Sequence, residues 1–266
     1  MRIEAQSGQR LLASLAVCPV CDADLDGLAG RHASCAGCGR TYRATDGVFD
    51  FVPEPPPDRD VAEPWALWEH LEENGRVSYE NDPHHNLSVG VREDCDAFAA
   101  FADLDGTVLD VGCGPQRLPT YARDFSGVLV GVDPLVGELP RAFVFVRAIG
   151  EYLPFRSDAF DRVLFATSLD HTLSPARALA EARRVVKPTG SVVLWVGEKA
   201  DHPHRHVRES HEWYDRLSVP EGAADRFHAV RFDRALARRY LKDAALDIVD
   251  VENDGRRNVF IRARKP

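Results

Sequence analysis

The sequence lacks long apolar runs. No stretch of about 18 consecutive apolar residues occurs, which argues against a transmembrane helix. The segment 1–17 has too short an apolar stretch, and an acidic Glu4, for a secretory signal. We therefore expect a cytoplasmic protein with no membrane partner.

Basic residues are outnumbered by acidic ones. Lys and Arg total 33 against 42 Asp and Glu, which gives a formal net charge of −9. A nucleic-acid-binding protein usually carries a basic surface, because contacts to phosphates supply much of the affinity. The charge balance therefore disfavours a nucleic-acid partner and leaves it as an alternative only.

Cysteine is used sparingly, yet four of the six cysteines form two CxxC pairs. Such spacing is typical of a closed four-thiolate zinc site, which stabilises a fold and leaves no position for catalysis. Two disulfides, disfavoured in a reducing compartment, and an iron–sulfur centre are the alternatives. His32 is a less favoured substitute ligand. We predict structural Zn²⁺ bound by Cys18, Cys21, Cys35 and Cys38.

The stretches "LLASLAVCPVCDADL" and "CAGCGRTYRATDGVFDFVP" resemble the zinc ribbons of methyltransferase-activator proteins and of some rRNA guanine methyltransferases. Residues 1–52 are accordingly predicted to form a zinc ribbon, with strands at 41–45 and 48–52 around an Asp-Gly turn. Residues 53–60 form a Pro-rich linker that can continue neither strand.

The remaining residues, 61–266, are predicted to form one larger domain that opens with a helical extension at 61–104. Trp65, Trp68 and Leu71 recur there at helical spacing, which indicates an amphipathic helix. We interpret this aromatic stripe as part of the core in preference to a binding pocket.

The strongest local pattern is "DGTVLDVGCGPQ". Its apolar residues 107–111 predict a buried parallel strand, and Gly112 and Gly114 permit a tight turn close to a ligand. We expect a helix to begin near Pro115 and to direct its free N–H groups at that ligand.

A second apolar strand, residues 128–132, follows and ends in Asp133. An acid at this place in a doubly wound sheet accepts hydrogen bonds from ribose hydroxyls. Asp110 lies near the end of the preceding strand. The glycine pattern stops short of GxGxxG, which counts against NAD.

These residues resemble motif I, and the acid that follows it, of class I S-adenosylmethionine-dependent methyltransferases. The likeness continues in "AIGEYLPFRSDAFDRVLFATSLDH" and in "ALAEARRVVKPTGSVVLWV", in the order that the family has them. The resemblance implies an α/β fold, a Rossmann-like seven-stranded sheet with helices on both faces, and S-adenosylmethionine as the cofactor.

The resemblance also assigns the cofactor site. It places the methionine end near Asp110 and Gly112, the ribose on Asp133, the adenine beside Ile149 and the sulfonium near Ser168. The full set of implied cofactor-binding residues is Asp110, Gly112, Gly114, Asp133, Pro134, Ile149, Gly150, Glu151, Thr167 and Ser168.

Three positions depart from the family pattern. Gln116 replaces the last glycine of motif I, which affects how the methionine end is held. Ile149 stands where many members have Asp, so the adenine loses a carboxylate partner. Thr189 changes the KPGG turn.

Histidines are the candidate catalytic bases. His171 follows the fourth strand of the family's sheet, with capping or packing as the alternative. His211 belongs with His202, His204 and His206 to a predicted lid at 198–230, where a metal site, substrate contact and a solvated loop are the alternatives.

We expect methyl transfer to an O or N nucleophile of a small-molecule acceptor, as in specialised metabolism. The alternative is an RNA guanine-N methyltransferase that uses its ribbon for recognition, and a third reading is a non-catalytic cofactor-binding protein. Residues 1–60 contain six Arg and nine Asp or Glu, so this part of the chain has little positive charge with which to bind a phosphate backbone. The sequence does not indicate an oligomeric state.

Overall fold

A seven-stranded mixed sheet forms the centre of the computed structural model, which describes residues 5–54, 56–81, 93–137, 139–197, 212–254 and 258–266. Its order is β10-β11-β9-β8-β5-β6-β7, in which β11 runs antiparallel to both of its neighbours, β10 and β9, and the other neighbouring pairs are parallel. The strands are β5 (Thr107–Val111), β6 (Val128–Asp133), β7 (Val144–Arg147), β8 (Phe160–Ala166), β9 (Val186–Gly197), β10 (Asp247–Asn253) and β11 (Asn258–Arg264).

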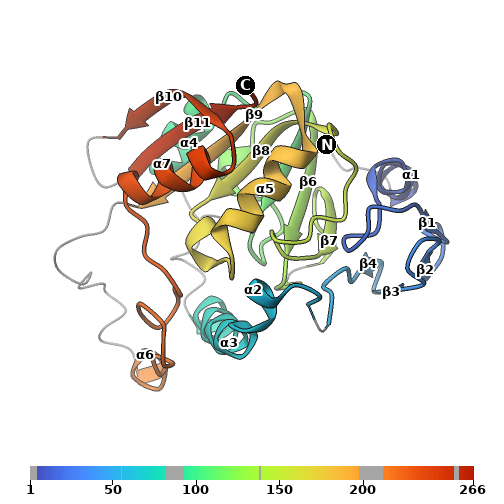
Figure 1. The fold of residues 1–266 in the computed structure, drawn as a ribbon, viewed down its shortest axis with the longest axis horizontal. Coiled ribbons are helices and arrows are strands. Elements are labelled where there is room, and N and C mark those ends of the chain that lie inside the picture. The colour runs from blue at the N-terminus through green and yellow to red at the C-terminus, as the bar shows by residue number, and fades with distance from the viewer. Residues whose placement is uncertain (1–4, 55, 82–92, 138, 198–211, 255–257) are drawn as a thin grey trace.

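Helices cover both faces of this sheet, as predicted (Figure 1). Helices α5 and α7 pack together on one face, and α4 packs against β11 on the other. Helices α2 and α3 lie at the end of the sheet where the parallel strands finish. Their bounds are α2 (Arg59–Ala62), α3 (Trp65–Asn81), α4 (Glu93–Ala102), α5 (Pro175–Val185), α6 (Glu212–Asp215) and α7 (Arg234–Asp243), with single 3-10 turns η2 (Thr120–Ala122) and η3 (Leu169–His171).

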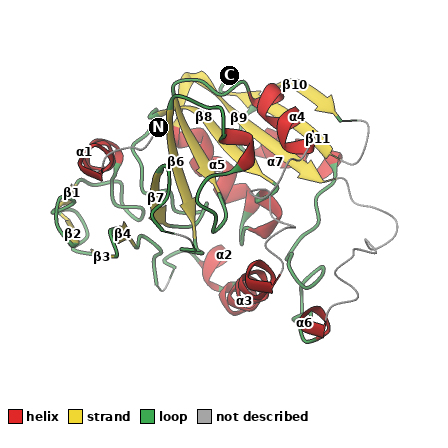
Figure 2. Cartoon of the chain, turned by 180° about the vertical axis from the view of Figure 1, so that it is seen from behind, coloured by secondary structure: helices red, strands yellow, loops and turns green. Residues whose placement is uncertain are grey.

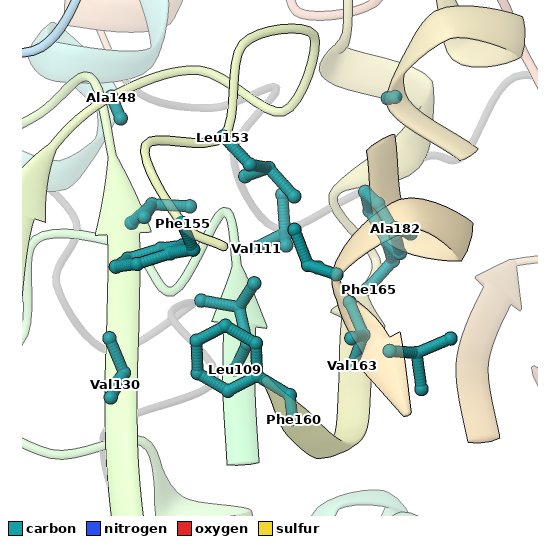
Figure 3. Packing of buried hydrophobic residues seen from close by; sticks show 14 of the residues in the cluster. Leu109, Val111, Val130, Ala148, Leu153, Phe155, Phe160, Val163, Phe165 and Ala182 are labelled. Atoms are coloured by element: carbon teal, nitrogen blue, oxygen red, sulfur yellow. The ribbon is translucent and has the colours of Figure 1, made fainter. Parts of the chain in front are cut away.

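Successive side chains along each strand point to opposite faces of the sheet, which divides the core into two layers. On β9, Val192 and Leu194 face the layer with α5 and α7, whereas Val193 and Trp195 face the layer with α4. Figure 3 shows the first layer, where Leu109, Val163 and Phe165 meet residues of neighbouring segments. The central strands are therefore buried on both sides, which explains their continuous apolar runs.

A separate small sheet precedes the large one. It has the antiparallel order β1-β2-β3-β4, and helix α1 (Ala5–Leu15) comes before it. The strands are β1 (Leu25–Asp26), β2 (His32–Cys35), β3 (Thr41–Thr45) and β4 (Val48–Phe49). We call residues 5–52 the N-terminal segment; it lies beside β7 at the edge of the large sheet (Figures 1 and 2).

Strand β4 ends earlier than the predicted 48–52, because the chain turns to the large sheet. Asp50 bridges to Arg147, and the N–H of Phe51 donates to the Arg147 carbonyl at 2.8 Å. The predicted linker also contains the start of α2. The predicted turn around Thr189 is an irregular part of β9.

No helix among the described residues is long and apolar enough to cross a membrane. The predicted helical extension contains α3 and α4, and residues 82–92 between them lie outside the described residues.

Phe51 joins the N-terminal segment to the large core. Its side chain is fully buried, and its ring lies 5.0 Å from that of Tyr42 and 5.7 Å from that of Phe49. We expect Phe51→Ala to lower the free energy of unfolding by about 3–5 kcal/mol, because it leaves a cavity in a packed layer. Urea denaturation measures this change.

Val249→Ala is the control, since Val249 is 51% exposed and should change stability by less than about 0.5 kcal/mol. Equal effects of the two substitutions would contradict the role given to Phe51.

Candidate functional site

A cavity of about 440 Å³ opens at the carboxyl ends of β5, β6 and β8. Nearly all the site residues predicted from the sequence that the structure describes line it. They are Gly112, Gly114, Asp133, Pro134, Ile149, Gly150, Glu151, Thr167, Ser168 and His171. Asp110 is not among the lining residues, and His211, with His202, His204 and His206, lies outside the described residues.

The turn after β5 brings the backbone close to the cavity. Gly112 and Gly114 have φ values of +76° and +75°, which favour glycine. A Cβ on Gly112 would overlap the side chain of Ser168. Ser168 itself donates from Oγ to the Val111 carbonyl and so ties β8 to the end of β5.

The N–H groups of this turn are used within the protein. Those of Gly112 and Cys113 donate to the Val132 carbonyl at 2.8 and 3.2 Å, and that of Gly114 donates to Asp133 Oδ2 at 2.7 Å. The turn therefore joins the ends of β5 and β6, and it does not present these N–H groups to a ligand.

The helix predicted to begin near Pro115 does not form; only the short η2 turn follows. Arg141 explains the difference, because its Nη1 donates to the carbonyls of Gly114 and Gln116, each at 2.7 Å. The guanidinium also packs 3.9 Å from the Phe145 ring centroid. These bonds take carbonyls that a helix would need, so the segment is an open loop.

Asp133 lies at the tip of β6 with both carboxylate oxygens held by the backbone. Oδ2 accepts from Gly114, and Oδ1 accepts from the Leu135 N–H at 2.8 Å. Burial raises the pKa of Asp133 to about 6, and these two hydrogen bonds oppose the rise. The side chain is oriented before any ligand arrives, with a face on the cavity.

Asp110 is placed behind the cavity wall. Its Oδ2 accepts from the Tyr121 hydroxyl at 2.7 Å, and it is Tyr121 that lines the cavity. Burial raises the pKa of Asp110 to about 7, against the effect of the Tyr121 hydrogen bond. The buried Oδ1 has no hydrogen-bond partner among the described residues. Asp110 therefore contacts the cavity only through Tyr121, whose hydroxyl it holds.

The loop after β7 forms another wall. Ile149 is buried, and Glu151 accepts from the Ser174 N–H at 2.9 Å, at the start of α5. Burial raises the pKa of Glu151. Gln116, at the position of the missing motif glycine, is buried and donates to the Cys113 carbonyl, so it fills space beside the turn.

Helix α3 closes the cavity with residues that the sequence did not identify as functional. Trp68 and Leu71, interpreted as core, are buried and also line the cavity. Glu72 lines it too, and burial together with the charges of Asp133 and Glu151 raises the pKa of Glu72 to about 8. Helical periodicity located this face correctly but could not tell a pocket wall from a core.

A second group of polar residues lies on the cavity wall around His171. Its ring packs against that of His228 at an interplanar angle of 37°, with centroids 4.4 Å apart, and Asp170 lies beside both rings. Burial, then the charge of His228, lowers the pKa of His171 to about 4, so the imidazole is neutral at pH 7. No motif in the sequence pointed to His228, which reaches the site from the segment before α7.

The four predicted zinc ligands meet in the N-terminal segment. Their sulfurs lie within 4.8 Å of one another, and Cys18 Sγ is 3.7 Å from Cys38 Sγ. Cys21 Sγ is 3.4 Å from Cys35 Sγ. Zn–S bonds of about 2.3 Å in a tetrahedron imply S–S separations of about 3.8 Å, so the cluster fits zinc with a small expansion. His32 is exposed and outside the cluster.

The surroundings of the sulfurs also suit a metal. The N–H groups of Gly37 and Cys38 point at Cys35 Sγ at 3.3 and 3.4 Å. The hydroxyl of Tyr42 lies 3.1 Å from Cys18 Sγ. Such hydrogen bonds stabilise thiolates and orient metal ligands. The six cysteines form no disulfide.

Residues 109–194, from β5 to β9, match the family described as "Methyltransferase domain". This segment is therefore similar to that family over about a third of the chain. It contains the glycine turn, Asp133, the 149–151 loop and His171, whereas Glu72 and His228 lie outside it.

Curated relatives match over the same part of the chain. An uncharacterized methyltransferase of Mycolicibacterium gilvum is 37% identical over 108 residues, which cover 36% of this chain and 42% of that protein. An uncharacterized methyltransferase of Mycobacterium tuberculosis is 36% identical with the same coverage. The chain thus spans 42% of the length of these relatives.

Solved structures share the fold of the methyltransferase domain. The 1,6-didemethyltoxoflavin-N1-methyltransferase of Burkholderia thailandensis superposes with a TM-score of 0.55 at 16% identity, over 86% of this chain and 97% of that one. A chain in the complex of the Haloferax volcanii Trm112 methyltransferase activator with a methyltransferase gives 0.51 at 18% identity, over 75% and 97%. The predicted Rossmann-like methyltransferase fold is confirmed.

Substitution of one thiolate tests the cysteine cluster. We expect Cys35→Ser to reduce bound zinc from about one equivalent per chain to a small fraction, because the metal loses a ligand and its charge. Elemental analysis after dialysis against a weak chelator measures the zinc. The thermal midpoint of the N-terminal segment should fall with it.

His32→Ala is the matched control on the same strand and should keep its zinc. Full zinc in Cys35→Ser, or unchanged stability after zinc is lost, would contradict the structural site.

Proposed function

We propose that this protein transfers the methyl group of S-adenosylmethionine to an O or N nucleophile of a small-molecule acceptor. The observation that carries the proposal is the cavity at the carboxyl ends of β5, β6 and β8, where the glycine turn and Asp133 lie side by side. We also propose that it acts in the cytosol, where unpaired thiols persist.

The residues present fit the cofactor. Gly112 lets the turn pass close to Ser168 on the cavity wall, where a Cβ would overlap that side chain, and Asp133 offers an oriented carboxylate to two ribose hydroxyls. Pro134 and Ile149 supply apolar walls for the adenine. Thr167 and Ser168, at the end of β8, are the proposed neighbours of the sulfonium.

The charge of the cavity suits a cation. Asp133, Glu151 and Asp170 line it against a single arginine, Arg231, among the described lining residues. Glu72 lines it too, but with a pKa raised to about 8 it is mainly neutral at pH 7. Carboxylates in a partly buried site attract a positive sulfonium more strongly than carboxylates in water do. The same charges would repel a phosphate backbone, which favours a small acceptor over RNA.

The cofactor would supply an activated methyl group, so the chain's task is alignment and exclusion of water. Trp68 and Leu71 of α3 close the cavity on one side. His171 is neutral at pH 7 and is the proposed base where the acceptor must lose a proton.

The size of the cavity supports a small acceptor. Sites for small molecules commonly occupy about 300–1,000 Å³, and this cavity has about 440 Å³. The Burkholderia thailandensis enzyme of similar fold is named for transfer to a small heterocycle. Zinc, held by four thiolates, is proposed as a structural ion only.

Labelled cofactor tests the proposal. Titration calorimetry should first show saturable binding of S-adenosylhomocysteine, and Gly112→Ala should weaken it at least about tenfold because its Cβ meets Ser168. Gly30→Ala, which meets only the Gly27 carbonyl at 3.4 Å, is the control.

Transfer of ³H-methyl is then measured to the small-molecule and bulk-RNA fractions of a cell extract. We expect label in the small-molecule fraction. Label confined to RNA would overturn the acceptor class, and absence of cofactor binding would overturn the whole proposal.

Cofactor affinity should depend on pH through Asp133. The pKa of this carboxyl is raised to about 6, so it is ionised above that pH and protonated below it. Only the ionised form accepts hydrogen bonds from both ribose hydroxyls. We expect S-adenosylhomocysteine to bind about tenfold more weakly at pH 5 than at pH 7.5, measured by calorimetry.

Asp133→Asn keeps the size of the side chain but cannot ionise. It should bind weakly and with little pH dependence between 5 and 7.5. A wild-type affinity that stays constant over this range would contradict the role of Asp133.

A further inference from the structure

Asp170, His171 and His228 bring three potential ligand atoms together on the cavity wall. His171 Nε2 lies 3.9 Å from Asp170 Oδ1, and His228 Nε2 lies 3.6 Å from Asp170 Oδ2. The ligand atoms of these three residues all fall within 4.8 Å of one another. Their arrangement is independent of the glycine turn and of Asp133.

The other nitrogen of each imidazole is bonded to an acceptor. His171 Nδ1 lies 3.0 Å from the Phe227 carbonyl oxygen, which can only accept, so Nδ1 carries the proton. His228 Nδ1 lies 2.7 Å from Asp225 Oδ1, which likewise accepts. In the neutral rings both Nε2 atoms therefore present lone pairs, and they face the Asp170 carboxylate.

Arg231 does not donate a hydrogen bond to the lone pair of His228 Nε2. Its Nη1 is 3.2 Å from both ring nitrogens of His228. One atom cannot lie along both in-plane lone pairs, because these diverge, so the guanidinium packs against the ring. Its Nε contacts Asp225 Oδ2 at 3.3 Å and so supports the carboxylate that orients His228.

We propose that His171 Nε2, His228 Nε2 and the Asp170 carboxylate bind one divalent transition-metal ion. Ligands about 2.1 Å from a tetrahedral ion lie about 3.4 Å apart, so the two nitrogen–oxygen separations of 3.9 and 3.6 Å need only a small inward shift. Imidazole and carboxylate ligands suit zinc and its first-row neighbours. Nδ1–H bonds to a carbonyl and a carboxylate are the usual supports of metal-binding histidines.

The metal site has room for a further ligand. Three protein ligands leave a tetrahedral ion with an open position, in contrast to the closed cysteine cluster. All three residues line the cavity, so an oxygen or nitrogen of the acceptor would complete the coordination there. With Nε2 on the ion and Nδ1 protonated, His171 would no longer act as the base, and the ion would instead lower the pKa of the coordinated acceptor group. This use by the acceptor rests on the proposed function, whereas binding of the metal itself does not.

The test uses Co²⁺ and the full chain with zinc already in its cysteine cluster. His202, His204 and His206, which alternate along a short stretch of the sequence, are replaced by Ala so that they do not bind Co²⁺ themselves. This triple variant is the background chain of the test. We expect one saturable equivalent of Co²⁺, with visible bands of N and O coordination and without thiolate charge-transfer bands. No cofactor or acceptor is present, so failure here is distinct from failure of methyl transfer.

Four variants complete the test, each checked by far-UV circular dichroism. His228→Ala and the near-isosteric Asp170→Asn should abolish binding of the Co²⁺ equivalent. Asp225→Asn should weaken Co²⁺ binding by about 10–100-fold, because the His228 ring loses the carboxylate that orients it. His70→Ala, which removes a partly exposed histidine bonded to Ser218, is the matched control and should bind normally.

Loss of the bound Co²⁺ in His228→Ala and Asp170→Asn, with the control unaffected, supports the site. No saturable equivalent in the background chain, thiolate bands in its spectrum, or undiminished binding in both ligand variants overturns it. If a ligand variant does not fold, the spectrum of the background chain still decides between N and O coordination and thiolate coordination.

Discussion

The site depends on the hydrogen bonds that join the end of β5 to the end of β6. The N–H groups of Gly112 and Cys113 share the Val132 carbonyl, and the N–H of Gly114 holds Asp133. These bonds require the left-handed backbone of two glycines, since a side chain there would be strained and would meet its neighbours. They orient a buried carboxylate at a fixed place, and the other walls are arranged around it.

The second constraint is the burial of carboxyl groups in and around the cavity. Asp110, Asp133 and Glu72 all have raised pKa values because the fold takes their carboxyl groups out of water. Asp133 and Glu72 line the cavity, so ionising them without a cation nearby is costly, and a cationic ligand lowers that cost. A sulfonium cofactor would favour the ionised forms of these carboxyl groups, which is a physical reason for such a ligand to bind tightly.

Local sequence predicted the elements whose causes are local. The apolar runs of β5 and β6 are continuous, so both strands and the acid at the tip of β6 were found. The helix after Gly114 failed because Arg141, 27 residues away, takes the carbonyls of that loop. His228 was missed for the same reason: it joins His171 through Phe227, which is 56 residues along the chain. Contacts between distant segments leave no periodic pattern to read.

The N-terminal segment reaches the site through one arginine. Arg147 ends β7, and its Nη1 contacts Asp50 Oδ2 at 2.7 Å, while its Nε donates to the Pro134 carbonyl at 3.0 Å. Pro134 lines the cavity next to Asp133, so the same guanidinium holds both the N-terminal segment and a wall of the site.

The residues after the N-terminal segment add a second connection. Asp58 accepts from the Tyr152 hydroxyl at 2.7 Å and pairs with Arg177 at 2.7 Å, which fixes the loop that carries Ile149. A metal that stabilised the N-terminal segment would therefore act on the cavity at a distance, through contacts that need no zinc chemistry. A closed thiolate cluster would in this way support a site to which it contributes no ligand.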